Sequence, residues 1–436
     1  MSAERSAAFK YLNTADLPEE WTADHFGNLV NFNLGRTPPR ASPIYWKEGK
    51  YPWVSISDMT PNGVITDTAE KVSQQAHDSI FRGKLVPEGS LLMSFKLTIG
   101  RMSRLGIPAF HNEAIISFQP NSEEISPEYL SYYLSQINFK DYQDTAIKGQ
   151  TLNKGKLNSL EIALPPLPEQ KKIAHILSTV QRAIEAQERI IQTTTELKKA
   201  LMHKLFTEGL RNEPQKQTEI GPVPESWEVA ELGEFFQIKH GFAFDGQFFE
   251  PSGEYILMTP GHFHEEGGFR DQGEKTKYFT GEIPKDYILA KDDLVVAMTE
   301  QKSGLLGSSA IVPEDGRYLH NQRLGLIVDL DGNRLSKRFL FNVFNHPHLR
   351  VEVAKTSTGS KVKHTSPTKL RAVKVGIPPT LEEQDEIATA ISTTERKIGV
   401  ATNKKTQLQD IFRTLLHELM TAKMRVDGID LPLGTP

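Results

Sequence analysis

Apolar residues recur every three or four positions along two segments of the chain, one in each half. This spacing is typical of a helix that buries one face against a partner. The first stripe comprises Ile173, Leu177, Val180, Ile184, Ile191, Leu197, Leu201 and Leu205, and the second comprises Ile387, Ile391, Ile398, Leu408, Leu415 and Leu419. A helix of about 40 residues, at about 1.5 Å per residue, would be about 60 Å long. The two stripes are natural partners.

Both segments begin with signals of a helix N-terminus. ALPPLPEQ and GIPPTLEEQ place prolines before or inside a first turn, with glutamates beside the positive end of the helix dipole. Thr380 and Glu383 have the spacing of a capping box. Only a short polar linker follows the first helix, so the second helix can pair along its length only by running back. We therefore predict an antiparallel coiled coil.

Short apolar runs, separated by Gly, Pro, Asn and Asp, precede each helix. Examples are PWVSISDM and GSLLMSF in the first half, and YILMTPG and DDLVVAM in the second. Such runs predict strands of an α+β domain. The expected organisation is a domain at 1–163, a helix at 164–209, a linker at 210–222, a second domain at 223–376, a helix at 377–425 and a tail at 426–436.

The second half of the chain repeats the first. LPEEW at 17–21 returns as VPESW at 223–227, and His111-Asn112 returns as His320-Asn321. The helices match at a constant offset of 214, in pairs that include Gln170/Gln384, Ser178/Ser392, Thr179/Thr393, Arg182/Arg396 and His203/His417. The offset drifts before the helices, as expected of loops of different length. The predicted fold is therefore pseudo-symmetric, with two α+β domains separated by two long helices.

Composition restricts the class of protein. Of the 436 residues, 38% are hydrophobic and 24% are charged, which fits globular domains. We expect a cytoplasmic protein, because no stretch reaches the roughly 18 apolar residues of a membrane span and the N-terminus lacks an apolar signal core. The chain has no cysteine, which excludes disulfides and thiol chemistry. With a formal net charge of −4, any DNA-binding surface must come from local basic clusters.

Sequence motifs of catalysis are missing. There is no G-x-x-x-x-G-K-[ST] phosphate loop, no G-x-G-x-x-G, no H-E-x-x-H and no G-x-S-x-G. There is also no Asn-Pro-Pro-Tyr-like segment for amino-methylation. No acidic residues have a spacing that distinguishes a metal or acid–base site from solvated charge. We therefore expect neither a catalytic centre nor a metal site.

Local basic stretches are the candidates for DNA contact. Seven basic residues lie between Arg350 and Lys374 against one acid, Glu352, and a smaller basic stretch precedes the first helix. Such loops suit phosphates, although they also serve as solubilising surface. Asn112 and Asn321 could pair with adenine, although such residues more often cap a strand or turn. The candidates are Lys96, Arg101, Arg104, Asn112, Lys148, Gln150, Asn153, Lys154, Lys156, Asn321, Arg323, Lys355, Lys361, Lys363, His364 and Lys369.

The ordered motifs resemble those of a type I restriction-modification specificity subunit, over nearly the whole chain. They are GRTPPR followed by YPWVSISDM, the HNEA and HNQR segments, GQTLNKGKL leading into LPPLPEQKKIAHIL, and TEIGPVPESW at the start of the second half. The second half departs from this pattern, because HGFAFDG stands where GRTPPR is expected. The resemblance implies that each α+β domain is a target-recognition domain for one half of a bipartite, asymmetric DNA site. The helices would then act as a ruler for the bases between.

The same resemblance implies the partners. They are double-stranded DNA, two methyltransferase subunits and two restriction subunits. S-adenosylmethionine, ATP and Mg²⁺ would be bound by those subunits, and this chain would hold no cofactor. Two alternatives stay open, a fused enzyme that modifies DNA by itself and a coiled-coil scaffold that joins two partner proteins without DNA.

Overall fold

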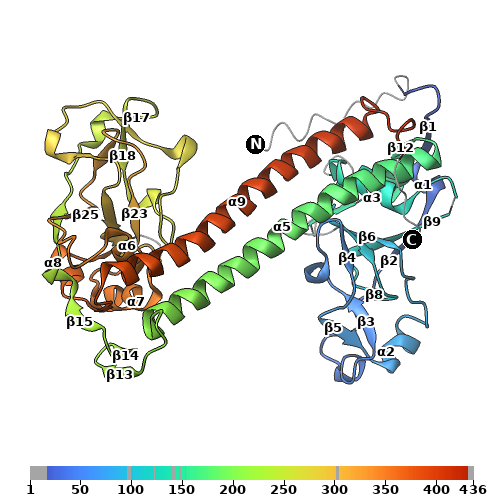
Figure 1. Cartoon of the computed structure of the whole chain (residues 1–436). Coiled ribbons are helices and arrows are strands. Elements are labelled where there is room, and N and C mark those ends of the chain that lie inside the picture. Colours follow the sequence, from blue (N-terminus) through green and yellow to red (C-terminus); the bar gives the residue numbers. More distant parts are fainter. Residues whose placement is uncertain are drawn as a thin grey trace. The chain divides into compact units, whose positions relative to one another are not determined.

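The computed structural model describes residues 17–95, 100–121, 123–139, 143–146, 149–152, 154–300 and 304–430. The chain divides into two compact units, residues 1–187 with 404–436 and residues 188–403. Each unit holds one α+β domain and part of both long helices (Figure 1). The predicted class, two α+β domains with two long helices, is confirmed.

The first domain is built on a five-stranded sheet in the order β2-β9-β6-β7-β4, in which only β4 and β7 pair in parallel. A three-stranded sheet in the order β5-β3-β8 lies further along the domain, and β1 pairs with β12. The strands are β1 (Thr22–His25), β2 (Val30–Leu34), β3 (Tyr51–Val54), β4 (Gly63–Ile65), β5 (Glu70–Val72), β6 (Leu91–Ser94), β7 (Met102–Leu105), β8 (Phe110–His111), β9 (Ile115–Pro120), β10 (Gln143–Ala146), β11 (Gly149–Leu152) and β12 (Glu161–Leu164). The helices are α1 (Phe26–Leu29), α2 (Gln74–Ser79), α3 (Pro127–Ser135) and α4 (Lys154–Asn158).

The second domain repeats this plan. Its sheet β16-β25-β21-β23 corresponds to β2-β9-β6-β7, and β15 pairs with β27 as β1 pairs with β12. A second sheet has the order β17-β19-β18-β24-β20, and short pairs join β13 to β14 and β22 to β26. The strands are β13 (Gln215–Thr218), β14 (Gly221–Pro224), β15 (Glu228–Glu231), β16 (Gln237–His240), β17 (Phe249–Glu250), β18 (Tyr255–Met258), β19 (Tyr278–Phe279), β20 (Ile288–Leu289), β21 (Leu294–Ala297), β22 (Thr299–Glu300), β23 (Ser309–Ile311), β24 (Tyr318–His320), β25 (Leu324–Val328), β26 (Lys363–His364) and β27 (Lys374–Ile377). The helices are α6 (Lys337–Asn345), α7 (Pro347–Thr356) and α8 (Pro367–Arg371).

The long helices α5 (Leu167–Glu208) and α9 (Leu381–Met420) pack antiparallel, as predicted. In the first unit the start of α5 shares a core with the end of α9, through Ile173 and Leu419. In the second unit the end of α5 shares a core with the start of α9, through Leu205 and Ile387. The rest of the predicted seam is buried at Leu177 and Ile391 and half-buried at Val180, Ile184, Ile191, Leu201, Ile398, Leu408 and Leu415.

Leu197 is the exception in the predicted seam, because its side chain is 56% exposed. Each four-residue step rotates a position by about 40° around a helix. Two such steps separate Leu197 from Leu205, which is far enough to turn Leu197 away from the core. Met202, which the stripe omitted, is buried beside Leu205 instead.

The candidate reading domains and their joints to the helices

A set of buried polar side chains fastens the first domain to the start of α5. The carboxylate of Glu169 is 2% exposed and accepts a hydrogen bond from the Trp21 indole Nε1 at 3.1 Å. Arg425, which follows the end of α9, donates to the same carboxylate from Nε at 2.8 Å and from Nη2 at 3.0 Å. Arg425 also reaches Glu20 at 2.7 Å, and these two carboxylates raise the pKa of its guanidinium. We call Trp21, Glu169, Gln170 and Arg425 the first joint.

Gln170 completes the first joint with three hydrogen bonds. Its Oε1 accepts from the Ser126 backbone N–H at 2.9 Å, and its Nε2 donates to the carbonyls of Glu124 at 2.7 Å and Pro165 at 2.9 Å. Ser126 is the N-cap residue of α3. The side chain of Gln170 is fully buried, and its direct hydrogen bonds tie the start of α3 to the start of α5.

The second domain has the same joint, formed by Trp227, Glu383, Gln384 and Arg211. Gln384 accepts from the Ser336 N–H at 2.7 Å and donates to the carbonyls of Arg334 at 2.9 Å and Pro378 at 3.1 Å. Ser336 is the N-cap residue of α6. The first joint therefore links the start of α5 to α3, and the second links the start of α9 to α6.

The second joint is also closed by an arginine that follows the other long helix. Trp227 Nε1 donates to Glu383 Oε1 at 3.4 Å, and Arg211 Nε lies 3.5 Å from Glu383 Oε2. Thr380 Oγ1 accepts from the Glu383 backbone N–H at 3.3 Å, as a capping box requires. The other half of the predicted capping box is wrong, because the Glu383 carboxylate turns to Trp227 and Arg211.

The duplicated His-Asn pairs form the same turn in both domains. Asn112 Oδ1 accepts from the Ala114 N–H at 3.0 Å, and Asn321 Oδ1 accepts from the Arg323 N–H at 3.0 Å. A side chain at Gly35 would clash with the Asn112 carbonyl, and one at Gly241 would clash with the Asn321 carbonyl. The matched glycines are thus explained by close backbone approach. Base contact by either asparagine stays a prediction.

Both histidines of these pairs are held neutral by burial. His111 is 3% exposed and His320 is fully buried, and desolvation lowers the pKa of each to about 4. His320 Nε2 donates to the Leu324 carbonyl at 3.0 Å. In the structure as described, its Nδ1 has no hydrogen-bond partner. These rings stabilise the turn at the end of a strand.

The basic stretch of the second domain separates into internal and exposed side chains. Arg350 donates to the carbonyls of Leu306 at 2.7 Å, Glu265 at 3.2 Å and Gly304, and burial lowers its pKa to about 10. Arg371 donates to the carbonyls of Phe236 at 3.1 Å and Gly233 at 2.9 Å. These two arginines brace loops, so the interpretation of the whole stretch as phosphate-facing is wrong for them.

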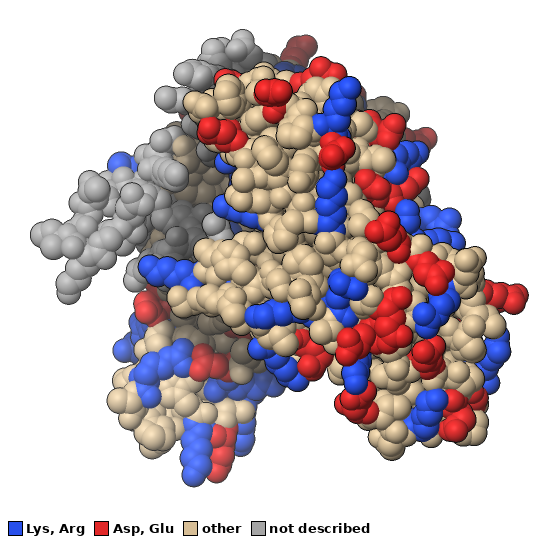
Figure 2. All heavy atoms as spheres, turned by 90° about the vertical axis from the view of Figure 1, so that its left-hand side faces the viewer, with Lys and Arg blue, Asp and Glu red and all other residues tan. Residues whose placement is uncertain are grey.

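The remaining basic candidates lie on or beside the loop between α7 and α8. Lys361 and His364 are exposed, Lys363 is half-buried, and His364 Nδ1 lies 3.3 Å from Thr299 Oγ1. Lys355 pairs with Glu352 at 2.7 Å, and Lys369 donates to the Thr356 carbonyl at 2.6 Å. Arg323 is exposed. Its segment lies next to the end of this loop, because the backbone of Met298 forms hydrogen bonds with both Arg323 and Thr365. Figure 2 shows acidic and basic side chains interspersed over the face of this domain.

The first-domain candidates are less informative. Arg101 Nη1 donates to the carbonyls of Ile56 at 3.3 Å and Met59 at 3.4 Å, and Arg104 pairs with Glu128 at 3.1 Å. Lys156 is exposed. Lys96, Lys148 and Asn153 lie outside the described residues, and so do the side chains of Gln150 and Lys154.

Comparison with known proteins places the duplicated domains in a family. A family model for the type I restriction modification DNA specificity domain matches residues 18–195 and 224–410. The chain belongs to this family. It is 24% identical to the type I restriction enzyme MjaVIII specificity subunit of Methanocaldococcus jannaschii and 26% identical to the putative MjaX specificity subunit of that organism. The first alignment covers 97% of both chains, and the second covers 96% of this chain and 97% of the relative.

The fold agrees with this assignment. The crystal structure of a type I restriction-modification S subunit from M. genitalium superposes with a TM-score of 0.60 at 16% identity, over 92% of this chain and 96% of the other. As a specificity subunit the chain is the non-catalytic member of its system, and its two α+β domains are target-recognition domains. No helix in the described ranges combines the length and the apolar character needed to cross a membrane.

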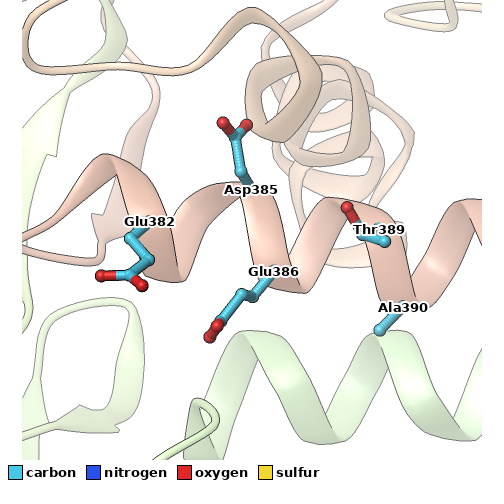
Figure 3. A pocket seen from close by; sticks show the side chains of 5 residues that line it. All are labelled: Glu382, Asp385, Glu386, Thr389 and Ala390. Atoms are coloured by element: carbon cyan, nitrogen blue, oxygen red, sulfur yellow. The ribbon is translucent and has the colours of Figure 1, made fainter.

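A shallow hollow in the second unit lies over the first turns of α9. Glu382, Asp385, Glu386, Thr389 and Ala390 line it, and Figure 3 shows Glu386 and Ala390 directed toward α5. Asp385 points the other way and accepts a short hydrogen bond from Ser336 Oγ. Three carboxylates disfavour phosphate here, so this hollow is no candidate for DNA contact.

The joints are the features that sequence reasoning missed. The spacing Glu169-Gln170 and Glu383-Gln384 was visible as a helix start, but the distant partners Arg425 and Arg211 were not. The one signal in the sequence is that Arg211 and Arg425 are 214 residues apart, the same offset that separates Glu169 from Glu383.

Proposed function

We propose that the two target-recognition domains read the two halves of a bipartite, asymmetric DNA site and that the helix pair sets the spacing between the half-sites. The observation that carries this proposal is the duplicated joint. A ruler requires each domain to keep a fixed orientation on its helix, and the three hydrogen bonds made by the buried side chain of Gln170 or Gln384 meet that need. The pseudo-symmetry suits two half-sites on one duplex.

Contact with DNA is proposed for the exposed basic side chains. In the second domain these are Lys361 and Arg323, with the half-buried Lys363 beside them in sequence. The backbone of Met298 bonds to Arg323 and to Thr365, which brings the segment of Arg323 next to the end of the basic loop. Lysine side chains neutralise phosphates, and an arginine can bind guanine with two hydrogen bonds. Because acidic side chains are interspersed with the basic ones on the face of the second domain that Figure 2 shows, we expect binding to depend on partner subunits.

The partner assignment follows the family. We propose a cytoplasmic complex with two methyltransferase subunits and two restriction subunits, in which those subunits bind S-adenosylmethionine, ATP and Mg²⁺ and this chain binds no cofactor.

Lengthening the helix pair tests the ruler. Four residues inserted at matched positions of α5 and α9 add about 6 Å, close to two base pairs at about 3.4 Å each. The complex with methyltransferase subunits should then prefer a spacer about two base pairs longer and keep both half-sites. The same four residues placed in the linker at 210–222 serve as the control and should change nothing. An unchanged spacer preference in a folded variant contradicts the ruler, and equal binding to all duplexes by the wild-type complex contradicts sequence reading.

A further inference from the structure

The turn formed by each His-Asn pair carries different side chains in the two domains. In the second domain the backbone N–H of Phe242 donates to the carbonyl of the paired histidine at 2.9 Å, and in the first domain that of Arg36 does the same at 2.9 Å. Phe242 therefore occupies the position of Arg36. The residues after the pair also differ, with Gln322-Arg323 in the second domain and Glu113-Ala114 in the first. We call Phe242, Gln322 and Arg323 the turn triad.

In the first domain the corresponding side chains are used within the fold. Arg36 Nη1 donates to the Ile80 carbonyl at 3.0 Å. The Glu113 carboxylate accepts a short hydrogen bond from Thr37 Oγ1. Ala114 is 9% exposed and has no polar group in its side chain. The first-domain turn therefore uses its polar side chains to hold its own loops together.

The turn triad of the second domain is exposed instead. Gln322 and Arg323 are exposed, and Phe242 is 38% exposed. Among the residues that the structure describes, the Gln322 amide and the Arg323 guanidinium make no hydrogen bond or ion pair. The Phe242 ring is supported from inside the domain, because its centroid lies 5.1 Å from that of Phe244 and 5.2 Å from that of Tyr287. All three side chains can therefore contact a molecule outside this chain.

The backbone that carries the turn triad is fixed by hydrogen bonds. The Gln322 N–H donates to the Phe242 carbonyl at 2.9 Å, and the Arg323 N–H donates to Asn321 Oδ1 at 3.0 Å. The Arg323 carbonyl accepts from the Met298 N–H at 2.9 Å. A segment that is already ordered loses less entropy when it binds. The turn thus presents its three side chains from set positions.

These side-chain types match the groups that base pairs present in the major groove of DNA. Arginine can donate two hydrogen bonds to guanine O6 and N7, glutamine can bond to adenine N6 and N7, and phenylalanine can contact the methyl group of thymine. A surface for phosphates alone needs positive charge, and the turn triad has one cation beside an amide and an apolar ring. Its composition therefore favours base edges.

We propose that the turn triad reads the half-site bound by the second domain, with Arg323 on a guanine, Gln322 on an adenine and Phe242 on a thymine methyl group. The inference deepens the proposed function and rests on it. The equivalent turn of the first domain serves only the fold, so other residues read the other half-site. One duplicated turn thus has two different roles.

Base analogues test the turn triad in the complex with methyltransferase subunits. Each duplex carries one substituted base: 7-deazaguanine and 7-deazaadenine lack the N7 acceptor, and deoxyuridine lacks the methyl group of thymine. In one half-site, wild-type binding should fall about tenfold for one guanine and for one adenine. It should fall about fourfold for one thymine, the effect of a buried methyl group of about 0.8 kcal/mol.

Alanine variants assign each penalty to a side chain. Arg323→Ala should lose the penalty for 7-deazaguanine, Gln322→Ala that for 7-deazaadenine and Phe242→Ala that for deoxyuridine, and each variant should keep the other two. Arg338→Ala, which removes an exposed arginine of α6 in the same domain, is the control and should keep all three. Arg36→Ala should change no base preference in either half-site. Thermal unfolding of the Gln322 and Arg323 variants should match the wild type, since both side chains are exposed.

Three outcomes overturn the inference. The first is that all three penalties persist in the variants of the turn triad. The second is that Arg323→Ala weakens binding to every duplex equally, which assigns the arginine to a phosphate. The third is that Phe242→Ala prevents assembly with methyltransferase subunits and leaves base preference unchanged, which assigns the ring to a protein contact. If the wild-type complex binds every duplex equally, the proposed function itself fails, and it does so before any variant is made.

Discussion

The two joints contain the same types of residue, but the arginine lies closer to the buried glutamate in the first joint than in the second. In the first, Arg425 makes two hydrogen bonds to Glu169 at 2.8 and 3.0 Å and a further contact to Glu20. In the second, Arg211 meets Glu383 only at 3.5 Å, and within the described structure Glu383 Oε2 has no hydrogen bond. The duplicated glutamine contacts, in contrast, are nearly the same in both joints.

The glutamine and the arginine of each joint therefore have different roles. The glutamine fixes a domain on the start of its own long helix, and that requirement is equal in both halves. The arginine lies just after the C-terminal end of the other long helix. Its contacts with the glutamate therefore join the end of one long helix to the start of the other. The first unit is tied more firmly than the second.

Removing the arginines should give the largest and most unequal effect. Arg425→Ala leaves the Glu169 carboxylate, 2% exposed, without its cation, which should cost about 3–5 kcal/mol of local stability. Glu383 is buried too, but Arg211 meets it only at 3.5 Å and is 55% exposed at its side chain, so the pair that Arg211→Ala removes is weak and the cost should be about 1 kcal/mol or less. Amide hydrogen exchange in the first turns of α5 and α9 measures both costs.

Arg413→Ala is the control for this comparison. Among the residues that the structure describes, Arg413 pairs only with the exposed Asp410 on the same helix, so its loss should leave exchange in both joints unchanged. Equal costs for Arg425→Ala and Arg211→Ala would contradict the difference in tightness between the joints.

Removing the glutamines should give a smaller and equal effect. Gln170→Leu and Gln384→Leu each remove three hydrogen bonds that a buried side chain makes to one backbone N–H and two carbonyls, which should cost about 2–4 kcal/mol. The cost should appear as faster amide hydrogen exchange in α3 and α6, because these glutamine side chains bond to the N-cap residues of those helices. Gln192→Leu, which replaces an exposed side chain of α5, is the control. A clearly unequal pair of costs would mean that the two domains are not fixed in the same way.

The sequence predicted the elements of the joints better than the joints themselves. The stripes on the long helices and the prolines and glutamates at their starts are local signals, and they predicted α5 and α9 to within a few residues. The arginine partners are distant in both cases, because Arg425 lies 256 residues after Glu169 and the whole second domain separates Arg211 from Glu383. Nothing local in Arg425 or Arg211 distinguishes them from solvated surface charge.

The candidate DNA-binding residues illustrate the same limit. A count of basic residues between 350 and 374 treats Arg350, Arg371 and Lys361 alike. Only the fold shows that the two arginines donate to backbone carbonyls while Lys361 is exposed. The matched His-Asn pairs were visible as a repeat, yet their role in a turn depends on Gly35 and Gly241, which approach from another strand.

Lowering the pH should destabilise the His111-Asn112 and His320-Asn321 turns by similar amounts. This is the smallest of the three predicted effects. His111 and His320 each have a pKa of about 4 in the folded chain and about 6.5 when unfolded, so the unfolded chain binds more protons between those values. The stability contributed by each neutral ring is therefore complete above about pH 6.5 and falls as the pH is lowered toward 4. Between pH 7 and pH 5 each histidine should account for about 2 kcal/mol of lost stability.

Glutamine variants isolate this contribution. His111→Gln should remove about 2 kcal/mol of the acid-induced loss in the first unit, and His320→Gln should do the same in the second. Lys239 and His240 lie near His320 and lower its pKa further, but burial is the larger cause, so the two variants should behave alike. His262 and His346 titrate in the same range in the second unit, so each variant is compared with the wild-type pH profile of its own unit. An unchanged slope between pH 7 and pH 5 in either variant would show that its ring is already protonated or solvated in the folded state, and the two turns would then not be equivalent.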